Sequence, residues 1–458
     1  MIRVIVVFCR ACQIIKIGSS TFGWLPKNAP SRKRIMESIL VALFVAGYAA
    51  IVFEHNIRLN KTASALFTGV LLWTLYALGL GQHEAMHQSL GEHFLGIAEI
   101  LFFLLGAMTV VELVDAHDGF SFITDRITTR NVRTLLWIVS IATFFLSAAL
   151  DNLTTAIVMM SLLRKLVRDV ERRKVFAGMV IIAANAGGAW SPIGDVTTTM
   201  LWIGGQITAL NIVVGVFLPS VVCMLIPLAG LSWRMSGELE PVAPKHHQEK
   251  PSGSLLMFIF GVGGLVFVPI FKSVTHLPPY MGMLFVLSLI WIASEVVHRG
   301  KDEEIRRPYT ASEALKRTDT PSILFFLGIL LAIGVLEVSG LLHHVALWLN
   351  QTVGNLDLIT ITIGLLSAVV DNVPLVAASM GMYDLAAYPQ DHKLWEFMAY
   401  AAGTGGSILI IGSAAGVAVM GMEKIDFMWY ARKIGLWAAL GYFAGAGVYL
   451  IQYALLHG

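Results

Sequence analysis

The stretches Ser147–Asn152 (Ser-Ala-Ala-Leu-Asp-Asn) and Ser367–Asn372 (Ser-Ala-Val-Val-Asp-Asn) decide how this chain folds. Each places an aspartate beside an asparagine in the middle of a long apolar run, where a charged side chain is costly and is usually retained for function. The two aspartates, Asp151 and Asp371, are 220 positions apart. Two copies of one costly motif at this separation indicate a chain built from two related halves.

The composition is that of an integral membrane protein. Of the 458 residues, 56% are hydrophobic and only 14% are charged, and the mean hydropathy is +0.73. Soluble domains carry about 25% charged residues. Apolar runs long enough to cross a bilayer, about 17 to 25 residues, recur throughout, so the sequence predicts an all-α membrane protein without a large soluble domain. The net charge of +2 gives no sign of nucleic-acid binding.

The predicted spans form two series in the same order. The first comprises residues 36–53, 64–80, 94–114, 133–150 running into 154–167, 175–203 and 209–231. The second comprises 255–271, 280–297, 321–337, 356–370 running into 373–382, 394–422 and 428–456. The chain thus divides into an N-terminal extension (1–35), a first repeat (36–231), a polar linker (232–253) and a second repeat (254–458). Duplication on this scale is typical of secondary transporters with inverted repeats.

Loop charges predict how the two Asp-Asn stretches enter the membrane. Basic residues flank the first stretch on both sides, from 126 to 133 and from 164 to 174, whereas the flanks of the second, 343–357 and 383–392, contain no lysine or arginine. Because basic loops face the cytoplasm, both ends of the first stretch lie inside and both ends of the second lie outside. This pattern predicts two re-entrant hairpins in inverted repeats, joined by a cytoplasmic linker. Arg32, Lys33 and Arg34 conflict with it, because they would lie outside.

Hairpin tips inside a membrane leave backbone groups unpaired, and such groups suit a small cation. Side-chain oxygens for this ion are offered at the first tip by Asp151, Asn152, Thr154 and Thr155, and at the second by Asp371 and Asn372. The alternative is that the two aspartates only cap helices. Two such acids at matching positions favour cation binding over capping alone.

The element after each hairpin is a span interrupted by glycines, with a proline in the first. The first break lies within residues 185–199 (Asn-Ala-Gly-Gly-Ala-Trp-Ser-Pro-Ile-Gly-Asp-Val-Thr-Thr-Thr) and the second within residues 403–413. Broken spans at corresponding places indicate a transport site. A third acid, Asp195, lies in the first break, and Ser413 takes the matching place in the second. The further candidate ligands here are Asn185, Thr197, Thr198 and Ser407.

Three acids in a desolvated core predict competition between a cation and a proton. Asp151, Asp195 and Asp371 would bind Na+ or Li+ when ionised and would otherwise hold a proton, more tightly than an isolated aspartate does. Competition of both ions for the same acids is sufficient for exchange, provided that the site faces one side at a time. An anion carrier is expected to avoid acids there.

Other polar residues carry weaker signals. Glu99, Glu337 and His93 lie in or beside predicted spans and are candidates for a proton path or pH sensing, with a solvated loop as the alternative for His93. Cys9 and Cys12 form a lone C-x-x-C, which we interpret as incidental, and the His246-His247 pair of the linker as solvated. The sequence contains no H-E-x-x-H or G-x-S-x-G string, so we predict a protein that is not an enzyme and needs no cofactor.

Three strings carry a resemblance to a known family. Residues 150–155 (Leu-Asp-Asn-Leu-Thr-Thr), 185–198 and 370–375 (Val-Asp-Asn-Val-Pro-Leu) resemble the NhaD-type sodium/proton antiporters of the ion transporter superfamily, and the resemblance covers residues 36–457. It implies exchange of Na+ or Li+ for H+ across a bacterial cytoplasmic (inner) membrane, serving salt tolerance and pH homeostasis, by a homodimer. The residues to which it assigns roles are Asp151, Asn152, Asn185, Asp195, Thr197, Thr198, Asp371 and Asn372, followed by Ser367, Ser407 and Ser413.

Two alternatives with the same architecture stay open. An arsenite or other metalloid permease has a similar tip, although Cys223 is the only cysteine in the apolar core of this chain. A dicarboxylate carrier is expected to present neutral Asn, Ser and Thr side chains to its anion.

Overall fold

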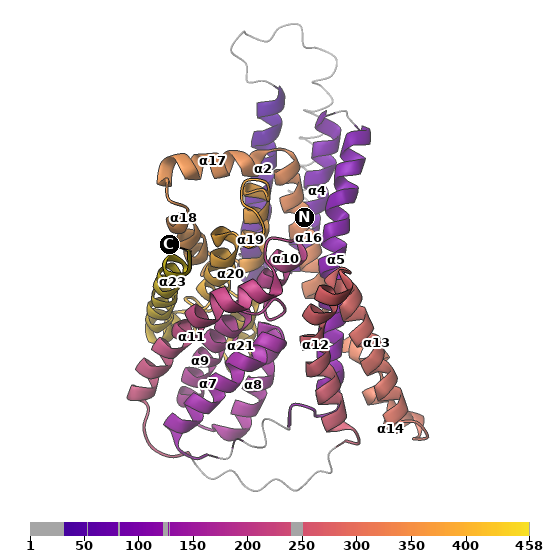
Figure 1. Cartoon of the computed structure of the whole chain (residues 1–458), viewed down its shortest axis with the longest axis vertical. Coiled ribbons are helices and arrows are strands. Elements are labelled where there is room, and N and C mark those ends of the chain that lie inside the picture. The colour runs from indigo at the N-terminus through magenta and orange to yellow at the C-terminus, as the bar shows by residue number, and fades with distance from the viewer. Residues whose placement is uncertain are drawn as a thin grey trace.

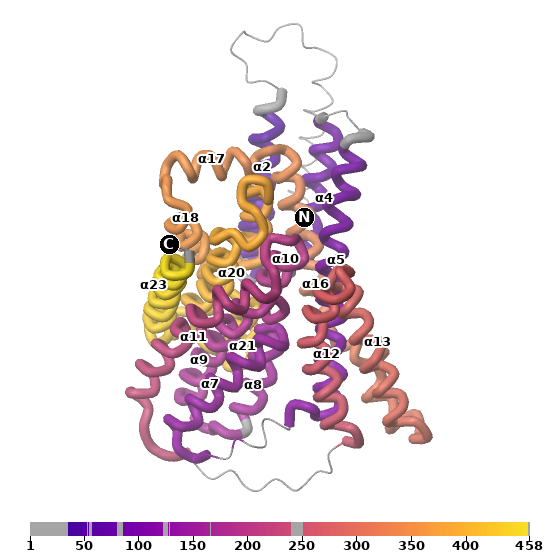
Figure 2. The backbone as a smooth tube through the Cα atoms, in the orientation of Figure 1, coloured from indigo at the N-terminus to yellow at the C-terminus, as the bar shows by residue number. Residues whose placement is uncertain are grey.

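The computed structural model describes residues 32–52, 54–80, 83–121, 127, 129–239 and 251–457, and these ranges are helical apart from short connections (Figures 1 and 2). The Cys9/Cys12 and His246/His247 pairs lie outside the described residues. So does most of the predicted N-terminal extension, whose last residues begin α2 (Arg32–Val52).

Nine helices within the described ranges are long and apolar enough to cross a membrane. They are α2, α4 (Lys61–Leu80), α5 (His83–Ala116), α7 (Val132–Ala149), α11 (Ala209–Arg234), α12 (Ser254–Thr275), α13 (Pro279–Val297), α16 (Thr320–Val338) and the C-terminal run of α22 (Phe427–Tyr430), η2 (Ala431–Gly435) and α23 (Leu436–His457). The prediction of a multi-pass, all-α membrane protein is confirmed.

Two hairpins and two broken helices contain the motifs. The first hairpin joins α7 to α8 (Asn152–Leu166), and the second joins α18 (Leu356–Leu366) to α19 (Asn372–Met382). The first broken helix consists of α9 (Val170–Ala189) and α10 (Val196–Ile203), and the second of α20 (Lys393–Gly405) and α21 (Ala414–Glu423). Each Asp-Asn pair therefore lies at a hairpin tip, and each glycine-rich string lies between two half-helices.

The same contacts recur in the two halves. Ser147 Oγ donates to Ala184 O at 2.6 Å, and Ser367 Oγ donates to Ala402 O at 2.8 Å. Each bond ties the tip of a hairpin to the broken helix that follows it. A Cβ built on Gly405 would overlap the backbone carbonyl of residue 364, and a Cβ built on Gly187 would overlap that of residue 144. In both halves, the hairpin and the broken helix are therefore joined by a serine-to-carbonyl hydrogen bond and a close glycine contact.

Figure 1 shows the hairpins entering the molecule from opposite ends. α7 and α8 lie at the end where α11 leaves for the linker and α13 leads to α14 (Glu303–Arg306), whereas α18 follows α17 (Leu341–Val353) at the other end. The first end also carries the arginines at the end of α8 and the start of α9, and we call it the basic end. That this end faces the cytoplasm, with the repeats inverted across a bilayer, stays a prediction.

The first helix begins at the end opposite the basic one. Thr62, at the start of α4, donates a hydrogen bond from Oγ1 to Pro321 O at the start of α16, at 3.0 Å. Met36, near the start of α2, lies against Gly79, at the end of α4. With the basic end in the cytoplasm, residues 32–34 would lie on the other side, so the conflict with the positive-inside rule remains.

Several elements differ from the prediction. The interval 343–357, predicted as a bare loop, contains most of α17, whose buried residues Leu342 and Ala346 are one turn apart while most others are exposed. A helix of 13 residues with one buried face is too short to be recognised as a span. α5 begins at His83 rather than near 94, because its polar first turns hide a helix from hydropathy. His93 thus lies within a helix. A 3-10 turn, η1 (Arg307–Tyr309), and α15 (Ala311–Arg317) precede α16.

Packing divides the spans into two groups. α4 packs along α16, and α5 packs against α12 and α13; we call α2, α4, α5, α12, α13 and α16 the scaffold group. α11 packs along α23, α7 along α9 and α18 along α20; we call α7–α11 and α18–α23 the hairpin group. The groups meet mainly where α16 contacts α19 and α5 contacts α10.

Candidate functional site

The carboxylate of Asp195 joins the two hairpin tips. This residue is 2% exposed and caps α10, with Oδ1 accepting hydrogen bonds from the Thr197 backbone and hydroxyl, both at 3.0 Å. Oδ2 accepts from Asn152 Nδ2 at 2.8 Å and from Asn372 Nδ2 at 3.4 Å. Because Asn152 and Asn372 are the first residues of α8 and α19, one buried acid holds three half-helix N-termini together.

Asn185 connects this acid to the second broken helix. Its Oδ1 accepts from Asn152 Nδ2 at 3.0 Å, and its Nδ2 donates to Ser407 Oγ at 2.9 Å and Ser413 Oγ at 3.0 Å. Ser413 caps α21 by accepting from the backbone of residue 416 at 3.1 Å. The structure thus brings seven of the predicted residues into one buried network: Asn152, Asn185, Asp195, Thr197, Asn372, Ser407 and Ser413.

Asp151 and Asp371 cap the half-helices α8 and α19, the arrangement that the sequence analysis gives as the alternative to cation binding. Asp151 accepts from the backbone and hydroxyl of Thr154 at 2.8 and 2.5 Å, and Asp371 accepts from the backbone of Val373 at 3.2 Å. In the part of the chain that the structure describes, no three His, Cys, Asp or Glu side chains form a group that could hold a metal ion. Each of the three acids is turned to the N-terminus of its own half-helix, and a single ion site shared by all three stays a prediction.

Four half-helices begin at the network, with Asp151, Asp195, Asp371 and Ser413 as their caps. A helix N-terminus carries a partial positive charge from its unpaired N–H groups. Three of these four caps are carboxylates. The site therefore combines backbone ends that attract negative charge with acids that supply it.

A cavity of about 50 Å³ reaches the first tip from the scaffold group. Asp151 and Asn152 line it on one side, opposite residues of α5, α12, α13 and α16 that include Phe103, Met283 and Phe326. Most of its lining is apolar. Neither residue of the second Asp-Asn pair lines it, so the cavity meets one tip only.

Three predicted ligands lie at the edge of the network. Thr198 Oγ1 donates to Ala189 O at 3.4 Å, and Ser367 is occupied with Ala402. The Thr155 hydroxyl is buried and has no partner among the described residues. A free buried hydroxyl one turn into α8 is the kind of group that a bound cation would satisfy.

The residues predicted for a proton path lie in the scaffold group. His93 Nδ1 is 4.0 Å from Glu337 Oε2, and its ring centroid is 6.3 Å from that of Trp73. This contact joins α5 to α16. Glu99 lies in α5, and no hydrogen bond between described residues connects it to the Asp195 network.

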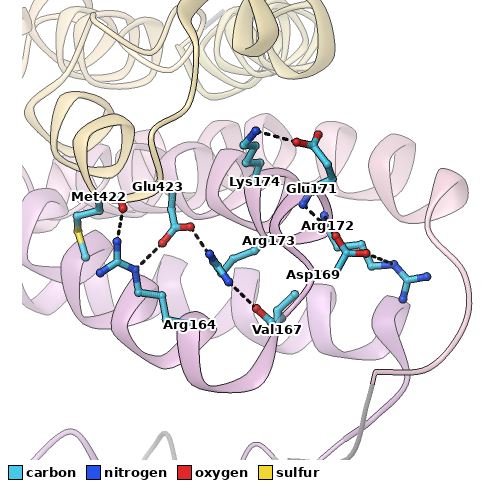
Figure 3. A network of polar contacts seen from close by, with 9 residues as sticks. All are labelled: Arg164, Val167, Asp169, Glu171, Arg172, Arg173, Lys174, Met422 and Glu423. Carbon is cyan, nitrogen blue, oxygen red and sulfur yellow. Dashed lines mark hydrogen bonds and ion pairs between the residues drawn. The ribbon is translucent and has the colours of Figure 1, made fainter.

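Two buried acids at the ends of the second broken helix are absent from the predicted set. Glu396 and Glu423 are each 5% exposed. Figure 3 shows Glu423 between two arginines, with Oε1 at 2.6 Å from Arg164 Nε and Oε2 at 2.7 Å from Arg173 Nε. The sequence signal that could have found them is that they lie at the two ends of one apolar run. Hydropathy alone places such end residues at the membrane surface and gives no sign that they are buried.

Comparisons with known proteins agree with this architecture. A family model described as citrate transporter matches residues 48–405. Sodium/proton antiporters 1 and 2 of Arabidopsis thaliana are 51% and 47% identical over 91% and 90% of this chain, and over 72% and 98% of their own lengths. The Na+/H+ antiporter NhaD of Vibrio cholerae is 30% identical over 83% of this chain and 84% of its own length.

A solved structure shares the fold. The YdaH transporter of Alcanivorax borkumensis, described as having an unusual topology, superimposes with a TM-score of 0.53 at 12% identity, over 92% of this chain and 99% of that one. The family match spans most of the present sequence. The chain belongs to the citrate-transporter family and is similar to NhaD-type sodium/proton antiporters.

Proposed function

We propose that this protein exchanges Na+ for H+ across a membrane, with Asp195 and the two hairpin tips as the ion site. The observation that carries the proposal is the charge of the four helix caps. Each helix N-terminus contributes about +0.5 elementary charge, so four contribute roughly +2. The three carboxylate caps contribute −3 when ionised. The remainder of about −1 suits one monovalent cation.

The same remainder argues against an anion. A carrier for citrate or another dicarboxylate gains from helix N-termini that are left positive, and neutral caps such as Ser413 would leave them so. Here three of four caps carry an acid. A metalloid permease gains no support either, because Cys223 is the free cysteine of the described ranges and lies buried in α11.

Cation and proton would compete for one oxygen. Asp195 Oδ1 is occupied by Thr197, and Oδ2 faces the amide groups of Asn152 and Asn372. A proton on Oδ2, or a cation beside it, must displace or turn one of these amides. An asparagine that turns presents its oxygen in place of its N–H groups. The free hydroxyl of Thr155 would then complete the shell around Na+ or Li+.

The membrane and the assembly belong to the same proposal. A membrane that separates two compartments of different Na+ and H+ concentration is sufficient, and relatives named sodium/proton antiporters come from a plant as well as from bacteria. With the basic end in the cytoplasm, the hairpins would enter from opposite faces as inverted repeats. The homodimer implied by the resemblance is part of this proposal.

The test is a pH-gradient assay with the purified full-length chain in proteoliposomes. We expect Na+ and Li+ to dissipate an imposed gradient, and Asp195→Asn to reduce the rate by about a hundredfold, which corresponds to about 2.7 kcal/mol. Asp151→Asn and Asp371→Asn should also reduce exchange severely while the protein still inserts. A gradient that responds to citrate or arsenite but not to Na+ would show that the proposal is wrong.

A further inference from the structure

Glu396 is a buried acid whose partners are neutral. It lies in the first turn of α20, where Oε1 accepts a hydrogen bond from Asn211 Nδ2 of α11 and Oε2 accepts one from the Tyr449 hydroxyl of α23, at 3.0 Å. Gly215 of α11 leaves the space for this carboxyl, since a Cβ there would lie 2.7 Å from Oε2. Three helices are thus packed around one acid.

No ion pair within the described residues neutralises this acid. The neighbouring ammonium of Lys393 is 2.7 Å from Asp357 Oδ2 and lies over the Tyr453 ring, 5.2 Å from its centroid. The charged and titratable groups around Glu396 are Asp391, His392 and Lys393 before it, Asp357 of α18, and Tyr449 and Tyr453 of α23. An isolated charge in such a place is costly.

Glu423, at the other end of the same broken helix, differs from Glu396 because it has cationic partners. Its carboxylate is paired with Arg164 and Arg173 (Figure 3). The two ends of one span therefore carry one acid that is paired with two arginines and one acid that has no cationic partner among the described residues.

The hydrogen bonds of Tyr449 are incomplete without an additional proton. Its hydroxyl lies 3.0 Å from Glu396 Oε2 and 3.1 Å from the backbone oxygen of Lys393, and both are acceptors. A tyrosine hydroxyl has one hydrogen and can serve one of them fully. When Glu396 is protonated, its O–H donates to the Tyr449 oxygen, and the Tyr449 O–H donates to Lys393 O. The protonated acid thus satisfies every group of this triad.

α20 leads from this acid to the ion site. Thr404 and Tyr400 follow Glu396 at intervals of four residues on one face of the helix, and the Thr404 hydroxyl donates to Tyr400 O at 2.6 Å. Ser407, just beyond the end of α20, accepts from Asn185 of the Asp195 network. A change of charge or packing at Glu396 therefore acts on the half-helix that ends at the cation site.

We propose that Glu396 is a second proton-binding site of the exchanger, separate from Asp195 and located toward the end opposite the basic one. This inference rests on the proposed function. A proton from water converts the carboxylate to the acid, the Tyr449 hydrogen turns to Lys393 O, and release of the proton reverses both steps. Each cycle leaves Glu396 and Tyr449 unchanged.

The test compares three variants of the full-length protein: Glu396→Gln, Tyr449→Phe and Glu423→Gln. Infrared difference spectra between acidic and alkaline pH should contain carbonyl bands of buried protonated carboxyls, and one of these bands should be present in the wild type and in Glu423→Gln but missing in Glu396→Gln. Tyr449→Phe removes the acceptor of the acid proton, so its band should move to higher frequency. Tyr449→Phe also keeps the test valid if Glu396→Gln does not fold.

Exchange in proteoliposomes supplies the second readout. Glu396→Gln should shift the pH of half-maximal exchange by about tenfold in proton concentration or flatten the profile, whereas Glu423→Gln should keep the shape of the wild-type profile. A Glu396→Gln spectrum that keeps every carboxyl band of the wild type, or a profile that superimposes on the wild type, overturns the proposal. If the wild type shows the Glu396 band but no Na+/H+ exchange, the proposed function is wrong and Glu396 still binds a proton.

Discussion

At the scale of single residues, Asn185 connects the first repeat to the second broken helix. It accepts from Asn152 of the first tip and donates to Ser407 and Ser413 of the second broken helix. All three bonds lie in the buried interior. A buried polar group that loses its partner costs about 1–3 kcal/mol. Removal of the Asn185 amide takes the acceptor from Asn152 and the donor from Ser407 and Ser413.

We therefore expect Asn185→Ala to weaken cation binding more than it weakens folding. The Na+ concentration for half-maximal exchange should rise about tenfold, which corresponds to about 1.4 kcal/mol, as measured by the Na+ dependence of exchange in proteoliposomes. Ser220→Ala is the matched control, because the Ser220 hydroxyl is also buried but has no partner among the described residues. An unchanged Na+ dependence in Asn185→Ala would remove this residue from the site.

At the scale of elements, each hairpin lies against its broken helix through a glycine. A Cβ on Gly405 would overlap the backbone carbonyl of Gly364 in α18, and backbone cannot turn aside as a side chain can. Overpacking of a well-packed core costs about 1–3 kcal/mol. Nothing lies within 4 Å of a Cβ built on Gly447 of α23.

Gly405→Ala should consequently lower the thermal unfolding midpoint of the purified protein, whereas Gly447→Ala should leave it unchanged or raise it, because alanine favours a helix by about 1 kcal/mol over glycine. The measurement is a thermal melt of both variants in the same detergent. Equal midpoints for Gly405→Ala and the wild type would show that α18 and α20 are free to separate.

The hairpins and breaks were predictable because their signals are local. An Asp-Asn pair in an apolar run, a cluster of glycines and the charges of the flanking loops each occupy a few adjacent residues, and their recurrence after 220 positions strengthens them. α17 was not predicted as a helix, because its buried apolar residues cover only one face of a short element. Glu396 was missed for another reason. Its environment exists only where α11, α20 and α23 meet.

At the scale of the whole molecule, the scaffold and hairpin groups meet around one cavity. It reaches Asp151 and Asn152, but neither residue of the second Asp-Asn pair lines it. The cavity therefore reaches the network from the first tip and not from the second. The ends of α5 and α13 meet near η1, outside the candidate spans, and aromatic and histidine rings pack together there.

His117 and His298 pack together at these helix ends, with ring centroids 5.1 Å apart, and the Tyr309 ring stacks on His298 at 4.4 Å. Each Nδ1 bonds to the backbone oxygen four residues earlier, and each buried Nε2 has no partner in the described ranges. Burial lowers the pKa of both histidines, and the charge of Lys301 lowers it further. The folded protein therefore binds fewer protons at this site than the unfolded chain does.

The sign of the pH effect follows from this difference. Stability from the neutral pair is fully present above the ordinary histidine pKa of about 6.5, and it is lost as the pH falls toward the lowered values in the folded protein. We expect the unfolding midpoint of the wild type to drop by about 2 °C or more between about pH 8 and pH 5 through this pair. The variant with His117→Gln and His298→Gln should lose that part of the drop, and His343→Gln, at an exposed position of α17, should keep it. An equal drop in the double variant would show that other groups set the acid sensitivity of the scaffold.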